Sequence, residues 1–313
     1  MLVTARPRCF WRRASSSASS YTFMLQLICC FCCILLSALG HSAPSPLPAS
    51  DPANHGHWVP FAPLTDEFDT NALDTTRWST APRDIGWAGR APGLFDPTNT
   101  AVADGTLLLG ARAARRNASW PAGFDNFTTS AVHSVNRTAH GYFEVRSRSG
   151  SSCISSSFWF HQNSGGSWTE IDVFESTGNS STTTRGGETP RQICSHTHVF
   201  KLAGVATADL PGKCGCKLEG AACSVGACTP LPFAVDDAFH TYGLQWNATT
   251  WQVFVDGAAV GPAFDAACLQ EPIGMDFDRE TMPFMRVPDS PFVTDRPFAI
   301  DYVRAWKQGA GTE

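Results

Sequence analysis

Several features that would assign this chain to a common class of protein are scarce or missing. The net charge is only -5 at pH 7 and no basic tract follows residue 43, so neither nucleic acid nor an anionic membrane surface is expected as a partner. Amphipathic helical periodicity is nearly absent after residue 60, which argues against a helical fold. There is no internal repeat. The one long apolar run, Met24–Leu39, has about 16 residues, short of the ~20 that span a membrane.

The N-terminus has the organisation of a secretory signal. Four arginines between residues 6 and 13 precede the apolar run, and Ala38-Leu39-Gly40 offers small residues for cleavage after Gly40. Residues 1–40 are therefore predicted to be a signal peptide. The alternative is a type II signal anchor, and only then would a membrane be a partner. Residues 41–60 are rich in proline and are predicted to be a linker. Residues 61–308 then form one domain of about 250 residues, a size that an all-β sandwich commonly has.

Sequons and cysteines agree with a secreted, extracellular protein. Seven cysteines follow residue 43, and in an oxidising compartment most should be paired. Because seven is odd, at least one is expected to be free or bonded to another chain. The N-glycosylation sequons stand at Asn117, Asn126, Asn136, Asn179 and Asn247.

Four of these cysteines lie close together in an insert at residues 211–232. Cys214, Cys216, Cys223 and Cys228 follow the pattern Cys-x-Cys-x6-Cys-x4-Cys. Since the first spacing is tighter than zinc ligands usually show, a small disulfide-stapled loop is favoured over a zinc knot. Its connectivity stays open.

Short β-prone runs separated by Gly, Pro, Asn and Asp clusters fill the region after residue 60. One of them ends in Asp256-Gly257, a hairpin signal. Many short strands with turn signals and little helix indicate an all-β sandwich of two antiparallel sheets. The predicted strands cover residues 106–111, 141–147, 155–161, 169–175, 196–201, 241–246, 251–255 and 297–306.

One of these strands carries three carboxylates within six residues. Alternation places Glu170 and Asp172 on one face and would send Glu175 to the other. A β-bulge repairs the count and returns Glu175 to the shared face. Neighbouring carboxylates push each other's pKa values apart. That separation is what a retaining glycosidase needs, because one carboxylate attacks while the other is held protonated.

The chain resembles glycoside hydrolase family 16 over residues 61–307. Glu170–Glu175 is the bulged form of that family's signature, with two residues before the second Glu, whereas its mixed-linkage glucanases and xyloglucan enzymes use the shorter form. The resemblance implies a concanavalin A-like jelly roll with a concave substrate groove. The supporting motifs are Asp66-Glu67-Phe68, Leu73-Asp74, Trp78, Gly141–Arg146, Ser157-Phe158-Trp159, Phe239–Tyr242, Val255-Asp256-Gly257 and Asp301–Arg304.

Three segments resemble the agarase, porphyranase and carrageenase branch of the family. They are Trp87–Pro92, Thr169–Glu175 and Glu280–Pro283. The cysteine-rich insert and the long N-terminus depart from the bacterial members of that branch.

The resemblance implies roles for particular side chains. Glu170 is expected to be the nucleophile, Glu175 the acid/base, and Asp172 the residue that tunes the pair. The expected substrate-binding residues are Trp87, Arg90, Trp159, Trp168, His198 and Glu280, with Arg90 suited either to a sulfate ester or to a structural carboxylate pair. His196 shares a face with His198 and is expected to be less involved. Asp301 resembles a position near a calcium site of many relatives. No metal is expected in the active site and no cofactor is required, so calcium would be structural.

The sequence thus predicts a secreted, monomeric, endo-acting retaining glycosidase that cleaves a β-linked galactan of the agar, porphyran or carrageenan type. The alternatives are hydrolysis of a β-1,3-glucan such as laminarin, transglycosylation, and a carbohydrate-binding protein without activity on the same fold. The intact Glu170/Glu175 pair favours an enzyme.

Overall fold

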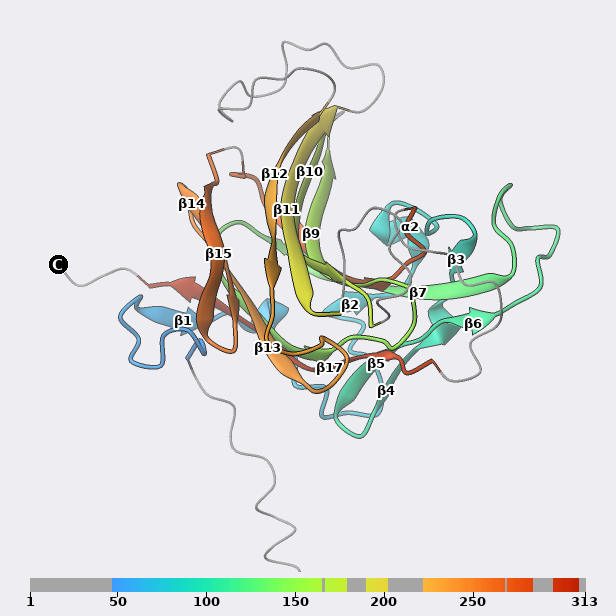
Figure 1. Cartoon of the computed structure of the whole chain (residues 1–313), viewed down its shortest axis with the longest axis horizontal. Helices are drawn as coiled ribbons and strands as arrows, with labels where there is room; N and C mark the ends of the chain where they lie inside the picture. The colour runs from blue at the N-terminus through green and yellow to red at the C-terminus, as the bar shows by residue number, and fades with distance from the viewer. Residues whose placement is uncertain are drawn as a thin grey trace, which may run out of the picture. The chain divides into compact units, whose positions relative to one another are not determined.

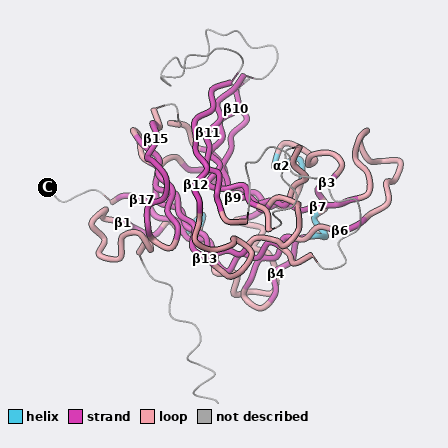
Figure 2. Tube along the Cα trace, viewed as in Figure 1, coloured by secondary structure: helices cyan, strands magenta, loops and turns pink. Residues whose placement is uncertain are grey.

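The computed structural model describes residues 47–164, 167–178, 190–201, 222–267, 269–283 and 295–309. The predicted signal segment at 1–40, the sequon at Asn179, and Cys214, Cys216 and Cys268 lie outside these residues. Strands and loops make up nearly all of the described chain, and helix is confined to short turns (Figure 2). In the described part of the chain, no helix is both long and apolar enough to cross a membrane.

Two sheets form the fold. Neighbouring strands are antiparallel apart from β3 and β7, which pair in parallel. The eight-stranded sheet runs β15 (Ala258–Asp265), β14 (Thr250–Val255), β13 (His240–Trp246), β8 (Gly141–Arg148), β17 (Phe298–Gln308), β5 (Thr106–Leu109) and β4 (Thr100–Ala103), with β1 (Trp58–Pro60) paired to β17.

The nine-stranded sheet holds the acidic strand near its middle. Its curved strands β12, β11, β10 and β9 lie side by side in Figure 1. It runs β12 (Ala222–Pro230), β11 (Gln192–Lys201), β10 (Ser167–Ser176), β9 (Ser156–Ser164), β16 (Ile273–Arg279), β7 (Phe127–Thr138) and β2 (Trp78–Ser79), with β3 (Gly93–Phe95) and β6 (Arg112–Ala113) paired to β7. The short helices are η1 (Ala62–Leu64), α2 (Pro82–Ile85) and η2 (Pro97–Asn99).

Alternation along the strands builds the core between the sheets. Phe160 of β9 packs on Phe143 of β8 with ring centroids 5.1 Å apart, and Phe174 of β10 packs on Tyr242 of β13 at 4.7 Å. These rings are almost fully buried, and each buried aromatic side chain of this size contributes about 2–3 kcal/mol to folding. The opposite faces of β9 and β10 are left to form the site. The predicted all-β, two-sheet fold is confirmed.

All eight predicted strands are present, with small changes at their ends. The strands that the sequence analysis missed include β7, β12 and β16. Every residue of β16 is buried, so this strand lacks the contrast between an apolar and an exposed face that reveals a strand in a sequence.

The predicted linker is wrong for residues 47–60. β1 pairs with the end of β17, and the Ala49 amide donates to Glu144 Oε2 at 2.9 Å. Trp58 is buried against Tyr142 and Trp306. Prolines and a turn-rich composition suggested a linker, but this segment extends the eight-stranded sheet.

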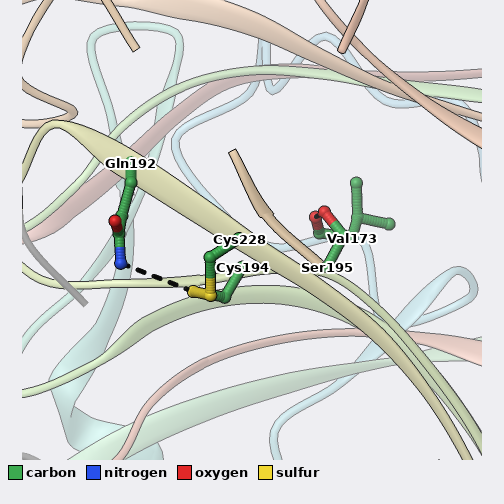
Figure 3. The surroundings of a disulfide bond; sticks show 5 residues. All are labelled: Val173, Gln192, Cys194, Ser195 and Cys228. Carbon is green, nitrogen blue, oxygen red and sulfur yellow. Dashed lines mark hydrogen bonds between the residues drawn. A yellow bond between two sulfur atoms is a disulfide. The ribbon is translucent and has the colours of Figure 1, made fainter. Parts of the chain in front are cut away.

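The predicted disulfide-stapled loop at 211–232 is wrong in its second half. Residues 222–230 are strand β12, which pairs with β11 along its length. Cys228 is bonded to Cys194 of β11, outside the insert, and the two residues are direct partners in the strand register. Figure 3 shows this disulfide, with Gln192 Nε2 donating to Cys194 Sγ at 3.7 Å. The bond ties the edge strand to the strand beside the acids.

Candidate active site

The three acids of β10 lie on one face because the strand contains the predicted bulge. Glu170 and Asp172 pair with His198 and His196 of β11 in regular register, and the register shifts before Glu175 pairs with Cys194. The register with β9 shifts at the same place. Val173 and Phe174 are both buried in the core, which the bulge allows. Glu170, Asp172 and Glu175 therefore line the same cavity.

This cavity has a volume of about 510 Å³, and all nine residues predicted for catalysis or substrate binding line it. Its walls come from β9, β10, β11, β16 and the segment around residue 90. The lining residues are Trp87, Gly89, Arg90, Ser157, Trp159, Trp168, Glu170, Asp172, Glu175, His198, Asp278, Glu280 and Met282. His196, which was expected to be less involved, is not among them.

Three indoles line the cavity, and each N–H donates to one of its acids. Trp168 Nε1 donates to Glu170 Oε2, Trp159 Nε1 to Asp278 Oδ2 at 2.8 Å, and Trp87 Nε1 to Glu280 Oε1 at 3.0 Å. The rings are in contact with one another, with centroids 5.1 Å apart for Trp87 and Trp159 and 5.7 Å apart for Trp87 and Trp168. Such rings suit the apolar C–H faces of a sugar.

Glu280 does not stand open to substrate. It is 1% exposed, and its carboxylate accepts the Trp87 indole and lies 3.5 Å from Arg90 Nη2. The Thr281 hydroxyl donates to the Arg90 carbonyl and so fixes the same segment. The structural pairing of Arg90 with a carboxylate is thus present. Arg90 Nη1 donates to Met282 Sδ at 3.2 Å, and the Arg90 side chain is still 47% exposed, so part of it remains open to a ligand.

Asp278 was missed by the sequence analysis. It is buried on β16, opposite Ser157 of β9, which in turn lies opposite Glu175. The signal that could have found it is the spacing of Asp276, Asp278 and Glu280, which resembles that of Glu170 and Asp172. Acids at every second position of a strand share a face.

The acids of the cavity raise one another's pKa values. Burial, together with the charge of Asp172, raises the pKa of Glu170 to about 8. Burial and the charge of Glu170 raise the pKa of Glu175 to about 7, with Arg90 acting in the opposite direction. The pKa of Asp278 is raised by burial and by the charges of Glu280 and Glu175. The cluster therefore holds protons near neutral pH, as general acid catalysis requires.

Two groups of side chains among the described residues have the composition of a metal site. In the first group, Asp276 Oδ1 lies 2.7 Å from His133 Nδ1, and Asp276 Oδ2 lies 2.7 Å from His161 Nδ1. That spacing fits N–H···O bonds and is shorter than the ~3.3 Å between two ligands of a tetrahedral zinc ion. In the second group, Glu170, Asp172 and His198, the Asp172–His198 contact is 3.4 Å, which a small divalent ion could bridge.

Asp301 belongs to neither group. Its Oδ2 accepts from Arg146 Nη1 at 2.5 Å on the eight-stranded sheet, so a guanidinium already compensates its charge. An arginine partner does not fit the oxygen cage that calcium prefers.

This fold, with a bulged acidic strand across the floor of an aromatic-lined cavity, places the chain among the family 16 glycoside hydrolases. The family model described as beta-porphyranase A–D, GH16 domain, matches residues 58–308, and the chain belongs to that family. Its members hydrolyse glycosidic bonds, which confirms the predicted family and the predicted glycosidase class.

Individual relatives agree with this assignment. Beta-porphyranase B of Zobellia galactanivorans is 27% identical over 284 residues, 85% of this chain and 90% of the relative. Its crystal structure superposes with a TM-score of 0.69 at 25% identity, covering 85% of this chain and 99% of that one. An extracellular agarase of Streptomyces coelicolor is 28% identical over 240 residues, 75% of this chain and 73% of the relative.

Proposed function

We propose that the chain is a secreted, endo-acting, retaining hydrolase of a β-linked galactan of the agar or porphyran type. The observation that carries the proposal is the convergence of Glu170 and Glu175 on one cavity through the bulge of β10. The named activities of its relatives, porphyranase and agarase, support a galactan as substrate. The N-terminal segment and the extracellular agarase support secretion.

In the proposed reaction, Glu170 attacks the anomeric carbon while Glu175 gives its proton to the glycosidic oxygen. The C–O bond to the leaving sugar breaks and a glycosyl ester on Glu170 forms. Glu175, now ionised, takes a proton from water as the water oxygen attacks the same carbon, which releases Glu170 and restores both residues. Two inversions leave the configuration at that carbon unchanged.

The first step needs an ionised Glu170 and a proton on Glu175. Burial raises the pKa of Glu170 and of Glu175, so the pair binds a proton near neutral pH. Positive charge that develops on the sugar ring beside Glu170 favours its ionised form. We propose that this charge keeps Glu170 ionised and the proton on Glu175 as the sugar approaches the transition state, with Asp172 and the Trp168 N–H holding Glu170 in place.

The substrate class rests on the wall formed by Trp87 and Arg90. Trp87 offers a ring face to a sugar, and the exposed part of the Arg90 side chain offers positive charge and N–H donors to an oxyanion such as a sulfate ester. A neutral agarose chain would use only the first of these contacts. A sulfated galactan would use both.

The test is product analysis on agarose, porphyran, carrageenan and laminarin, with wild type beside Glu170→Ala. We expect oligosaccharides from a galactan and a rate about 10⁴-fold lower in the variant. Glu67→Gln is the matched control, because Glu67 pairs with Arg304 on the eight-stranded sheet, and it should keep wild-type rates.

Release from laminarin alone would overturn the substrate class and leave the chemistry standing. Binding of a galactan without cleavage, equal in wild type and Glu170→Ala, would contradict the enzyme and indicate a carbohydrate-binding protein.

A further inference from the structure

A fourth ring, the imidazole of His161 on β9, packs against the three indoles whose N–H groups donate to the acids of the cavity. Its centroid is 4.9 Å from Trp159 and 4.8 Å from Trp168, nearly parallel to both at 25° and 23°. Trp87 meets it edge-on at 5.3 Å. His161 does not line the cavity and is 5% exposed. It therefore contacts every indole of the site while lying behind them.

The imidazole of His161 is held by a hydrogen bond to a buried carboxylate. Asp276 of β16 is 2% exposed, and its two oxygens accept from His161 Nδ1 and His133 Nδ1 at 2.7 Å each. Burial alone would raise the pKa of Asp276, but the two imidazoles outweigh it and the pKa is lowered. Asp276 thus stays ionised, and a charged acceptor roughly doubles the strength of each bond.

The backbone leaves room for this arrangement at one position. A Cβ on Gly274 would overlap the ring of His133. Gly274 lies opposite His161 in the strand register, just as Asp276 lies opposite Trp159. The network of His133, Asp276 and His161 thus spans β7, β16 and β9, beneath the row of indoles.

The network reaches the reacting carboxylates through these rings. Glu170 lies opposite His161 on the neighbouring strand, and the Trp168 ring that stacks on His161 donates its N–H to Glu170. Trp159 and Trp87 connect the same imidazole to Asp278 and Glu280. A stacked ring held at its Nδ1 has one orientation, and the orientation of each indole sets where its N–H points.

We propose that Asp276 and His161 are positioning residues that hold the indole of Trp168, and through it the nucleophile Glu170, in the reactive arrangement. The inference rests on the proposed function, because it assigns Glu170 the attacking role. It adds to the reaction two residues that touch neither the cavity nor the reacting atoms.

Two variants separate the ring from its hydrogen bond. His161→Phe keeps a stacked ring and loses the bond to Asp276, and Asp276→Asn keeps the shape and loses the charge. We expect kcat on the cleaved galactan to fall about 10- to 100-fold in each, the range seen when remote changes misplace reacting groups by about 1 Å.

The pH profile gives a second readout that a purely structural role would not move. The Trp168 hydrogen bond lowers the pKa of Glu170, so its loss raises that pKa. Glu170 must be ionised to attack, and the acidic limb of kcat/KM should therefore move to higher pH in both variants.

A third readout does not depend on activity. Indoles in contact give a strong near-ultraviolet circular dichroism signal, which should weaken in both variants of the free protein. Asp256→Asn is the matched control, because Asp256 accepts from His240 Nδ1 at the same 2.7 Å on the other sheet. It should leave kcat, the pH profile and the dichroism unchanged.

Unchanged dichroism, or folded variants with wild-type kcat and pH limb, would overturn the inference. If His161→Phe or Asp276→Asn does not fold, Gly274→Ala displaces His133 while keeping every polar group, and the same three measurements apply. A wild type that cleaves no galactan would refute the proposed function, whereas the dichroism would still decide whether the network orients the indoles.

Discussion

The pKa of Glu175 is shifted in opposite directions by two neighbouring charged side chains, Arg90 and Glu280. Arg90 lowers the pKa of Glu175 and Glu280 raises it, while the same two side chains lie 3.5 Å apart. The positive charge that would otherwise deprotonate the acid is therefore partly neutralised by Glu280. Sequence reasoning placed Glu280 in the site but as a substrate contact, because the pairing partner comes from a segment about 190 residues earlier.

Removing the charge of Glu280 and removing that of Arg90 should shift the basic limb of the pH profile in opposite directions. Glu175 must be protonated for the first step, so its pKa sets the basic limb of kcat/KM. Glu280→Gln keeps an acceptor for the Trp87 indole but removes the negative charge, which lowers the pKa of Glu175 and moves the basic limb to lower pH. Arg90→Gln should move it to higher pH. Limbs that shift together, or not at all, would contradict this electrostatic arrangement.

Strand β10 and its neighbours show what local pattern can and cannot reveal. The bulge could be predicted because Glu170, Asp172 and Glu175 share a face only with one extra residue. Asp278 escaped prediction because β16 is buried on both faces, and its acids read as interruptions of an apolar run. The network around Asp276 depends on which strands are neighbours, and one sequence carries no local signal of that order.

The disulfide was mispredicted for the same reason. Cys194 and Cys228 are 34 residues apart, and spacing within the insert pointed to its own cysteines instead. The bond links β11 to the edge strand β12 at the pair next to Glu175. The disulfide therefore holds the edge strand β12 against β11 beside Glu175.

Loss of this disulfide should lower the stability of the fold more than the catalytic rate. For a closed loop of this length, the entropy released in the unfolded chain predicts that Cys194→Ser/Cys228→Ser lowers the free energy of unfolding by about 3–4 kcal/mol. Denaturant titration of the oxidised proteins measures this, with Cys153→Ser as a buried cysteine outside the pair for comparison. A change below about 1 kcal/mol would show that strand pairing alone fixes β12.

At the scale of the whole molecule, one sheet supplies chemistry and the other supplies support. The nine-stranded sheet carries the acids, the indoles and the buried network, and the eight-stranded sheet packs its aromatic residues behind them. Sequence patterns predicted the two antiparallel sheets because many short β-prone runs separated by turn signals recur along the chain. They did not predict that residues 47–60 extend the supporting sheet, since an edge strand three residues long has little pattern to show.

The central claim is that Glu170 and Glu175 act as nucleophile and acid/base in a double displacement on a galactan. Proton NMR of the products, recorded within the first minutes of cleavage, reads the configuration of the new reducing end before mutarotation. We expect the β anomer first, with the α anomer appearing only as the sugar equilibrates, and neither in Glu170→Ala. An α anomer formed first would mean a single displacement by water and would contradict the assignment of Glu170 as nucleophile.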